Sequence, residues 1–185
     1  MGRLAGMRAY VSGPMDSPES KGGLIWRKTI TPRLQKMGVG VIDPTNKPCQ
    51  GVLEDDKTRQ NIAKSRESGD YELVQNYVKQ IVKTDLRFVD VSDFLIVYLD
   101  IKEFPCGTYD ELFMACNQRK PVLIVCPYGK NKVPGWLWGR IPHELFFGSF
   151  DDMFQYLEHI DKSKDIDTLN RWVFIDYKKV FGYEK

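Results

Sequence analysis

Apolar residues along the chain gather in short continuous runs that alternate with stretches in which they recur every three or four positions. A short apolar run bounded by glycine or proline is typical of a buried strand, whereas the helical recurrence predicts a helix with one buried stripe. The predicted strands are residues 7–12, 39–43, 93–99, 121–126 and 144–147. The predicted helices are residues 24–37, 71–91, 108–119 and 150–160.

The alternation of strands and helices predicts an α/β fold for most of the chain. Strands joined by crossover helices pair in parallel, and the crossovers are right-handed. We therefore expect a doubly wound, flavodoxin-like, mostly parallel five-stranded sheet with helices on both faces. At 185 residues, the chain is long enough for one domain with a full-sized core.

Two segments depart from this pattern. Residues 45–70 are polar and lack a clear period, so we expect a long insertion that passes over the sheet edge. Residues 161–185 are rich in aromatic side chains, and there the helix and strand patterns compete. Those side chains need a surface to pack against, either on the same subunit or on a neighbouring one. We therefore divide the chain into an α/β domain, residues 1–160, and an aromatic C-terminal tail, residues 161–185.

The composition narrows the possible functions. Hydrophobic residues make up 42% and charged residues 28%, which is typical of a globular protein. The formal net charge of +2 leaves no basic footprint for a nucleic acid polymer. The four cysteines form no CxxC pair and only two histidines accompany them, so we expect no metal site. No secretory signal opens the chain and no apolar run reaches the length of a membrane span, so we expect a cytoplasmic protein without a membrane partner.

Residues suited to acid–base or covalent chemistry follow the predicted strands. Tyr10 and the turn Ser12-Gly13-Pro14-Met15 lie at the carboxyl end of the first strand, and Asp100 follows the third. Glu111 lies near the start of the next helix. In a flavodoxin-like order these two strands are neighbours and flank the switch point where ligands bind. Asp85 lies among helical apolar positions, and a carboxylate in such surroundings needs a partner or a purpose.

Each of these acids also has an interpretation without catalysis. Thr108 and Glu111 have the spacing of a capping box, in which both side chains bind free amides at the start of a helix. Asp85 can be neutralised at the rim of the domain by Lys83, by Arg87 or by solvent. These residues alone do not decide between the alternatives.

Three blocks of residues, taken in order, resemble the nucleoside 2-deoxyribosyltransferase family, including the related nucleotide N-glycosidases. The blocks are Tyr10-Val-Ser-Gly-Pro-Met15, then Asp85-Leu86 ahead of Val91-Ser92-Asp93, then Gly107-Thr-Tyr-Asp-Glu111-Leu112. Each block is weak by itself, and the ordered combination is specific. The resemblance covers residues 7–126.

The resemblance implies an exchange at the glycosidic carbon of a nucleoside, and we expect no cofactor. Glu111 would attack C1′ of a 2′-deoxyribonucleoside, and the covalent deoxyribosyl-enzyme would pass its sugar to another base or to water. Asp85 would handle the proton on the base, and Tyr10 would orient the nucleophile. The substrate-binding residues would be Ser12, Gly13, Pro14, Met15, Asp100, Gly107 and Thr108.

The resemblance leaves the reaction and its substrate open. Transfer of 2-deoxyribose between nucleobases is the first hypothesis, followed by hydrolysis of a (deoxy)nucleoside or its 5′-monophosphate, and then by a nucleotide-sensing domain without turnover. Relatives that hydrolyse monophosphates have a basic residue near Met15 and a serine near Pro105. This chain has neither, which favours the free nucleoside, although residues 17–23 offer an alternative phosphate nest. The family also implies a homo-oligomer, a dimer or larger, whose partners are small molecules: a nucleoside or nucleotide and a free nucleobase.

Overall fold

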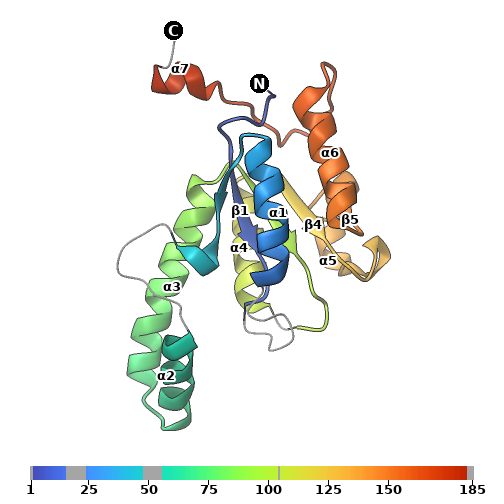
Figure 1. Ribbon diagram of the computed structural model, residues 1–185. Helices are drawn as coiled ribbons and strands as arrows, with labels where there is room; N and C mark the ends of the chain where they lie inside the picture. Colours follow the sequence, from blue (N-terminus) through green and yellow to red (C-terminus); the bar gives the residue numbers. More distant parts are fainter. Residues whose placement is uncertain (1, 16–23, 48–55, 104, 183–185) are drawn as a thin grey trace.

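The computed structural model describes residues 2–15, 24–47, 56–103 and 105–182, and a five-stranded parallel sheet forms its centre (Figure 1). The phosphate nest expected at residues 17–23 lies outside the described residues. The strands are β1 (Arg8–Ser12), β2 (Gly40–Ile42), β3 (Phe94–Tyr98), β4 (Val122–Val125) and β5 (Phe146–Phe147). Their order is β2-β1-β3-β4-β5, so the switch point lies between β1 and β3. This confirms the predicted doubly wound, flavodoxin-like class.

Helices cover both faces of the sheet (Figure 1). The long helices are α1 (Leu24–Lys36), α3 (Tyr71–Val91), α4 (Cys106–Asn117) and α6 (Phe150–Lys162). On one face Trp26 of α1 stacks on Phe150 of α6, with ring centroids 5.6 Å apart, while α3 and α4 pack together on the other. The shorter segments are η1 (Pro44–Asn46), α2 (Asp56–Glu67), η2 (Lys130–Lys132), α5 (Gly135–Trp138), η3 (His143–Leu145) and α7 (Tyr177–Phe181). Within the described ranges, no helix combines the length and apolar character needed to span a bilayer.

Strands β3 and β4 form the centre of the hydrophobic core. Residues 94–97 and 122–124 are completely shielded from solvent. Because helices pack on both sides, every position in these strands must be apolar, and the sequence shows no alternation. For this reason both strands were predictable to within one residue at each end.

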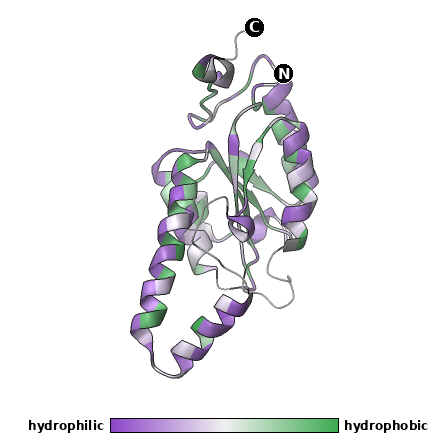
Figure 2. Ribbon diagram, turned by 60° about the vertical axis from the view of Figure 1, so that its left-hand side comes forward, coloured by the Kyte–Doolittle hydropathy of each residue, from purple (hydrophilic) through white to green (hydrophobic). Residues whose placement is uncertain are grey.

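Residues 56–67 form a helix, where the sequence pattern had predicted part of an irregular insertion. This helix, α2, pairs with the first half of α3 in a helical hairpin that projects away from the sheet (Figures 1 and 2). The turn is closed by Asp70, whose carboxylate accepts a hydrogen bond of 3.3 Å from the backbone N–H of Leu73. Because α2 contains only two apolar residues, Ile62 and Ala63, it has no apolar stripe from which a helix could be predicted.

The aromatic C-terminal tail packs at the amino end of β3. Trp172 is buried, its ring centroid lies 5.3 Å from that of Phe94, and its Nε1–H donates to Tyr156 Oη at 2.8 Å. Tyr177 donates its hydroxyl proton to Asp93 Oδ1 at 2.7 Å. The described part of the tail therefore has a packing surface on its own subunit, and contact with a neighbouring subunit stays a prediction.

Candidate active site

Two hydroxyl-bearing side chains of β1 point to the same face of the sheet. Successive side chains of a strand alternate between faces, so Tyr10 and Ser12 both point toward α3 and α4. The Tyr10 ring centroid lies 6.2 Å from that of Phe88 in α3, and both β1 residues are fully buried. Since Ser12 is the last residue of β1, the two hydroxyls lie at the carboxyl end of the strand, beside the switch point.

The carboxylate of Glu111 faces these two hydroxyls. Tyr10 Oη donates to Glu111 Oε1 at 2.6 Å, and Ser12 Oγ donates to Glu111 Oε2. Only 9% of the Glu111 residue surface is exposed. Hydrogen bonds to an ionised oxygen are strong and directional, so both carboxylate oxygens are held in place from a single strand.

The capping box that the spacing of Thr108 and Glu111 allowed as an alternative does not form. Helix α4 begins at Cys106, two residues before the predicted start, with Pro105 at its N-cap and no side-chain cap. Proline is tolerated at a helix start because no intrahelical N–H bond is required there. Glu111 therefore lies in the second turn of α4, and its carboxylate turns toward β1 instead of the helix terminus.

The surroundings of Glu111 give its carboxyl group an unusual proton affinity. Burial raises the pKa of Glu111 to about 7, while the hydrogen bonds from Ser12 and Tyr10 favour the anion and oppose that rise. Burial and the nearby Glu111 charge raise the pKa of Tyr10 well above its usual value, so this hydroxyl stays protonated and remains a donor. Glu111 is thus more basic than an ordinary glutamate and still partly ionised at neutral pH, which suits a nucleophile or a general base.

Asp85 completes a group that we call the acidic cluster: Tyr10, Ser12, Asp85 and Glu111. Asp85 is buried on α3, and its negative charge raises the pKa of Glu111 further, beyond the effect of burial. Its ion-pair partner is Lys47, whose Nζ contacts Asp85 Oδ1. The alternative in which Lys83 or Arg87 neutralises Asp85 is therefore wrong, because a lysine 38 residues upstream pairs with it. Burial raises the pKa of Asp85, and the hydrogen bond from Lys47 lowers it.

Arg27 is a functional candidate that sequence reasoning missed. It projects from α1, only 1% of its surface is exposed, and its guanidinium donates to the backbone oxygens of Val11 at 3.3 Å and Gly13 at 3.1 Å. Its Nε lies 3.6 Å from Asp43 Oδ1 at the end of β2. Arg27 thus anchors the turn after β1, and its charge favours ionised Glu111. No sequence signal marks it, because a single arginine in a helix usually points to solvent.

The other predicted substrate-binding residues after β1 and at the start of α4 lie in different local environments. At Gly13 an added Cβ would lie 3.0 Å from the Trp26 ring and 3.1 Å from the backbone oxygen of Tyr98, so a larger residue would force these neighbours to shift by a few tenths of an ångström. Pro14 and Met15 follow it and are partly exposed. At Gly107 an added Cβ would meet nothing within 4 Å, which leaves open space beside α4. Thr108 is buried one residue further on.

Asp100 also lies at the carboxyl ends of the strands, but its hydrogen-bond partners are not those of the acidic cluster. Its Oδ1 accepts hydrogen bonds from the backbone N–H of Lys102 at 2.9 Å and from Tyr128 Oη at 3.1 Å. Within the described part of the chain, no contact joins Asp100 to the acidic cluster. Its predicted part in substrate binding stays a prediction.

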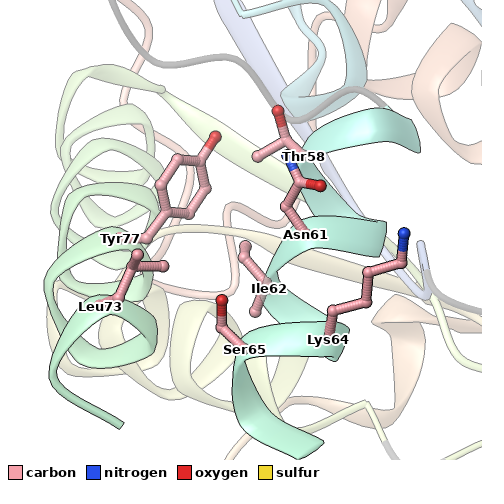
Figure 3. A pocket seen from close by; sticks show the side chains of 7 residues that line it. All are labelled: Thr58, Asn61, Ile62, Lys64, Ser65, Leu73 and Tyr77. Carbon is pink, nitrogen blue, oxygen red and sulfur yellow. The ribbon is translucent and has the colours of Figure 1, made fainter. Parts of the chain in front are cut away.

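A separate cavity of about 540 Å³ lies between α2 and α3 (Figure 3). It is lined by Thr58, Asn61, Ile62, Lys64, Ser65, Leu73 and Tyr77. None of these residues belongs to the acidic cluster. The chemistry-bearing site and this cavity are therefore distinct features of the molecule.

Comparison with known proteins supports the fold. No family model and no curated protein matches the sequence. A 2-deoxyribosyltransferase from Bacillus psychrosaccharolyticus matches 91% of this chain and 98% of its own, with a TM-score of 0.55 and 14% identity. A CMP N-glycosidase, BcmB, from Clostridium botulinum matches 82% of this chain and 98% of its own, with a TM-score of 0.48 and 13% identity. The first comparison shows that this chain has the fold of a 2-deoxyribosyltransferase, so the resemblance predicted from the three sequence blocks holds for the fold.

Proposed function

We propose that this protein transfers 2-deoxyribose between nucleobases through a covalent deoxyribosyl-glutamate intermediate on Glu111. The observation that carries the proposal is the placement of a buried carboxylate at the switch point, with Tyr10 bonded to one oxygen and Ser12 to the other. A second acid, Asp85, lies close enough to Glu111 for its negative charge to raise the pKa of Glu111. This arrangement suits nucleophilic attack at an acetal carbon followed by proton exchange with a leaving group.

In the first half-reaction, a Glu111 oxygen forms a bond to C1′ while the bond from C1′ to the base nitrogen breaks. The electron pair of the broken bond leaves with the base, and the protonated form of Asp85, which burial favours by raising the pKa of this carboxyl group, supplies the proton that neutralises the base. The transition state resembles an oxocarbenium ion, so the nearby Glu111 anion stabilises it before the bond forms. Tyr10 and Ser12 hold the carboxylate in one orientation, which reduces the entropic cost of reaching the reactive geometry.

In the second half-reaction, a nitrogen of the incoming base attacks C1′ and the bond between C1′ and Glu111 breaks. Asp85 accepts the proton that the incoming base releases, which restores its state before the first step. If water is the acceptor instead, the products are free base and free sugar. Transfer and hydrolysis thus differ only in what occupies the acceptor position.

A base-exchange assay tests this proposal. The protein is incubated with a 2′-deoxynucleoside, with and without a second free base, and released base and exchanged nucleoside are separated chromatographically. Exchange supports the transferase, release without exchange assigns a hydrolase, and binding without either product assigns a sensor domain.

A matched pair of variants tests the nucleophile. Glu111→Gln should lower turnover by several orders of magnitude, because the amide is almost isosteric with the carboxylate but is not a nucleophile. Asp110→Asn makes the same chemical change one residue away on an exposed position of α4 and should leave turnover almost unchanged. Near-normal turnover in the Glu111 variant would exclude the covalent intermediate.

A further inference from the structure

The segment that follows β2 brings two charges of opposite sign to the site. Asp43 Oδ1 lies 3.6 Å from Arg27 Nε, and Lys47 Nζ contacts Asp85 Oδ1. Between them, the backbone N–H and the hydroxyl of Thr45 both donate to Asp43 Oδ1, at 2.8 Å and 2.7 Å. The segment is therefore tied to α1 at one end and to α3 at the other, which holds Lys47 against Asp85.

Lys47 is buried, which is unusual for a lysine. Only 4% of its side chain and 11% of the Asp85 side chain are exposed. Its Nζ also lies 5.9 Å from the ring centroid of Phe88, which follows Asp85 by three residues on α3. Removing two charges from water is costly, and an apolar pair of similar volume often stabilises a fold equally well. The buried pair therefore calls for an explanation other than stability.

The contact with Lys47 occupies one oxygen of Asp85 and leaves the other available. Within the described ranges, Oδ2 of Asp85 has no hydrogen-bond partner. The titratable groups that face Asp85 from other elements of the described structure are Tyr10 on β1, Arg27 on α1 and Glu111 on α4. Lys47 differs from them because it combines a positive charge with a direct hydrogen bond to the carboxylate. Lys47 is therefore the neighbour that most favours ionised Asp85.

We propose that Lys47 is the positioning residue of Asp85: it fixes Oδ1 and stabilises the carboxylate that forms when Oδ2 gives its proton to the departing base. This inference rests on the proposed function, which sets the direction of that proton. The O–H bond of protonated Asp85 breaks, its proton forms an N–H bond with the base, and the electron pair stays on the carboxylate. Lys47 keeps its own protons throughout. The attraction between ammonium and carboxylate grows as the proton leaves, so it lowers the barrier and not only the energy of the bound state.

A titration of Asp85 tests this role without relying on turnover. The protein is labelled with carbon-13 at the aspartate carboxyl groups, and the Asp85 resonance is identified by its loss in Asp85→Asn. An opposite charge in contact lowers a carboxyl pKa by about 1 to 3 units. Lys47→Met removes the charge and keeps a side chain of similar length, so the midpoint of Asp85 should rise by about 1 to 3 pH units. Lys47→Arg, which keeps the charge, should retain most of the lowered midpoint.

The matched control is Lys83→Met, because Lys83 is exposed on α3 two residues before Asp85. It should leave the midpoint of Asp85 within a few tenths of a pH unit. In the base-exchange reaction, Lys47→Met should lower kcat more for poor leaving groups than for good ones. It should also move the high-pH limb of the kcat/KM profile upward, because Asp85 then keeps its proton to a higher pH. A residue that only supported the fold would lower kcat equally for all bases and leave the limb in place.

A double variant keeps the test valid if Lys47→Met by itself does not fold. Adding Asp85→Asn removes the unpaired buried charge, so the double variant should unfold at a higher urea concentration at pH 8 than Lys47→Met alone. Losses of stability that simply add in the double variant would mean that the two charges do not interact, and this would overturn the proposal.

The outcomes separate the role of Lys47 from the proposed function. An Asp85 midpoint that is unchanged in Lys47→Met, or that Lys83→Met moves equally far, would overturn the role of Lys47 even if base exchange is observed. A raised midpoint together with a failed base-exchange assay would support the control of Asp85 by Lys47 and exclude the transferase.

Discussion

The buried position of Glu111 makes the stability of the protein depend on pH in a predictable direction. Its pKa is about 7 in the folded protein, against 4.5 for an ordinary glutamate. A group with a raised pKa binds its proton more tightly in the folded state than in the unfolded state. The stability that protonated Glu111 contributes is therefore complete below pH 4.5 and is lost as the pH rises through about 7. At 1.36 kcal/mol per pKa unit, the full loss is about 3 kcal/mol.

The Glu111→Gln variant isolates this contribution, because glutamine has the same shape and does not titrate. The free energy of unfolding of wild type and variant is measured by urea denaturation from pH 5 to pH 8. We expect the variant to gain about 2 to 3 kcal/mol relative to wild type across that interval, since only the wild type must keep a buried charge. Asp110→Asn, at an exposed position, should follow the wild-type curve.

A difference between Glu111→Gln and wild type that stays constant with pH would refute this reasoning. It would mean that the carboxyl group of Glu111 titrates in the folded protein as it does in the unfolded chain. The argument that burial makes Glu111 an unusually basic nucleophile would then fail, whatever the activity of the variant.

Three further changes probe the site and the tail. Tyr10→Phe removes a hydrogen bond that favours ionised Glu111, and since such a bond contributes about 1.5–3 kcal/mol, the midpoint of the kcat/KM profile should move upward by about 1 to 2 pH units. Asp85→Asn should slow base departure more for poor leaving groups than for good ones, as measured by kcat over a series of nucleobases. Trp172→Ala should lower the free energy of unfolding by about 3–5 kcal/mol in urea denaturation, because a cavity opens beside Phe94.

Each of these three predictions has a result that would contradict it. Tyr109→Phe removes a hydroxyl from α4 outside the acidic cluster. If the kcat/KM profile of this variant moves as far along the pH axis as that of Tyr10→Phe, the Tyr10 effect is not specific. An equal effect of Asp85→Asn on all leaving groups would remove its proton-donating role. Trp136 is 76% exposed, so if Trp136→Ala costs as much as Trp172→Ala, burial of the tail is not the cause.

A helix could be predicted from the sequence only where it buries an apolar stripe of its own. Helix α3 places apolar residues at helical spacing, and its predicted bounds agree with the structure. Helix α2 has two apolar residues and forms against α3, so the pattern gave no sign of it. The spacing of apolar residues along the sequence reflects which side of a helix is buried. A helix that buries few side chains therefore shows almost no apolar periodicity.

The amino-acid sequence by itself determined the order of the elements, the parallel sheet and the identity of Tyr10, Asp85 and Glu111 as candidates. The periodicity of apolar residues and the position of a residue at the end of a strand are local properties, so both can be recognised from the sequence alone. Only the tertiary structure decided which side chains meet. Tyr10 reaches Glu111 across 101 positions and Lys47 reaches Asp85 across 38, and Arg59 meets the turn at Met15 across 44. Which charge neutralises which depends on how the loops fold back over the strand ends, because electrostatic pairing follows distance in space and not distance along the chain.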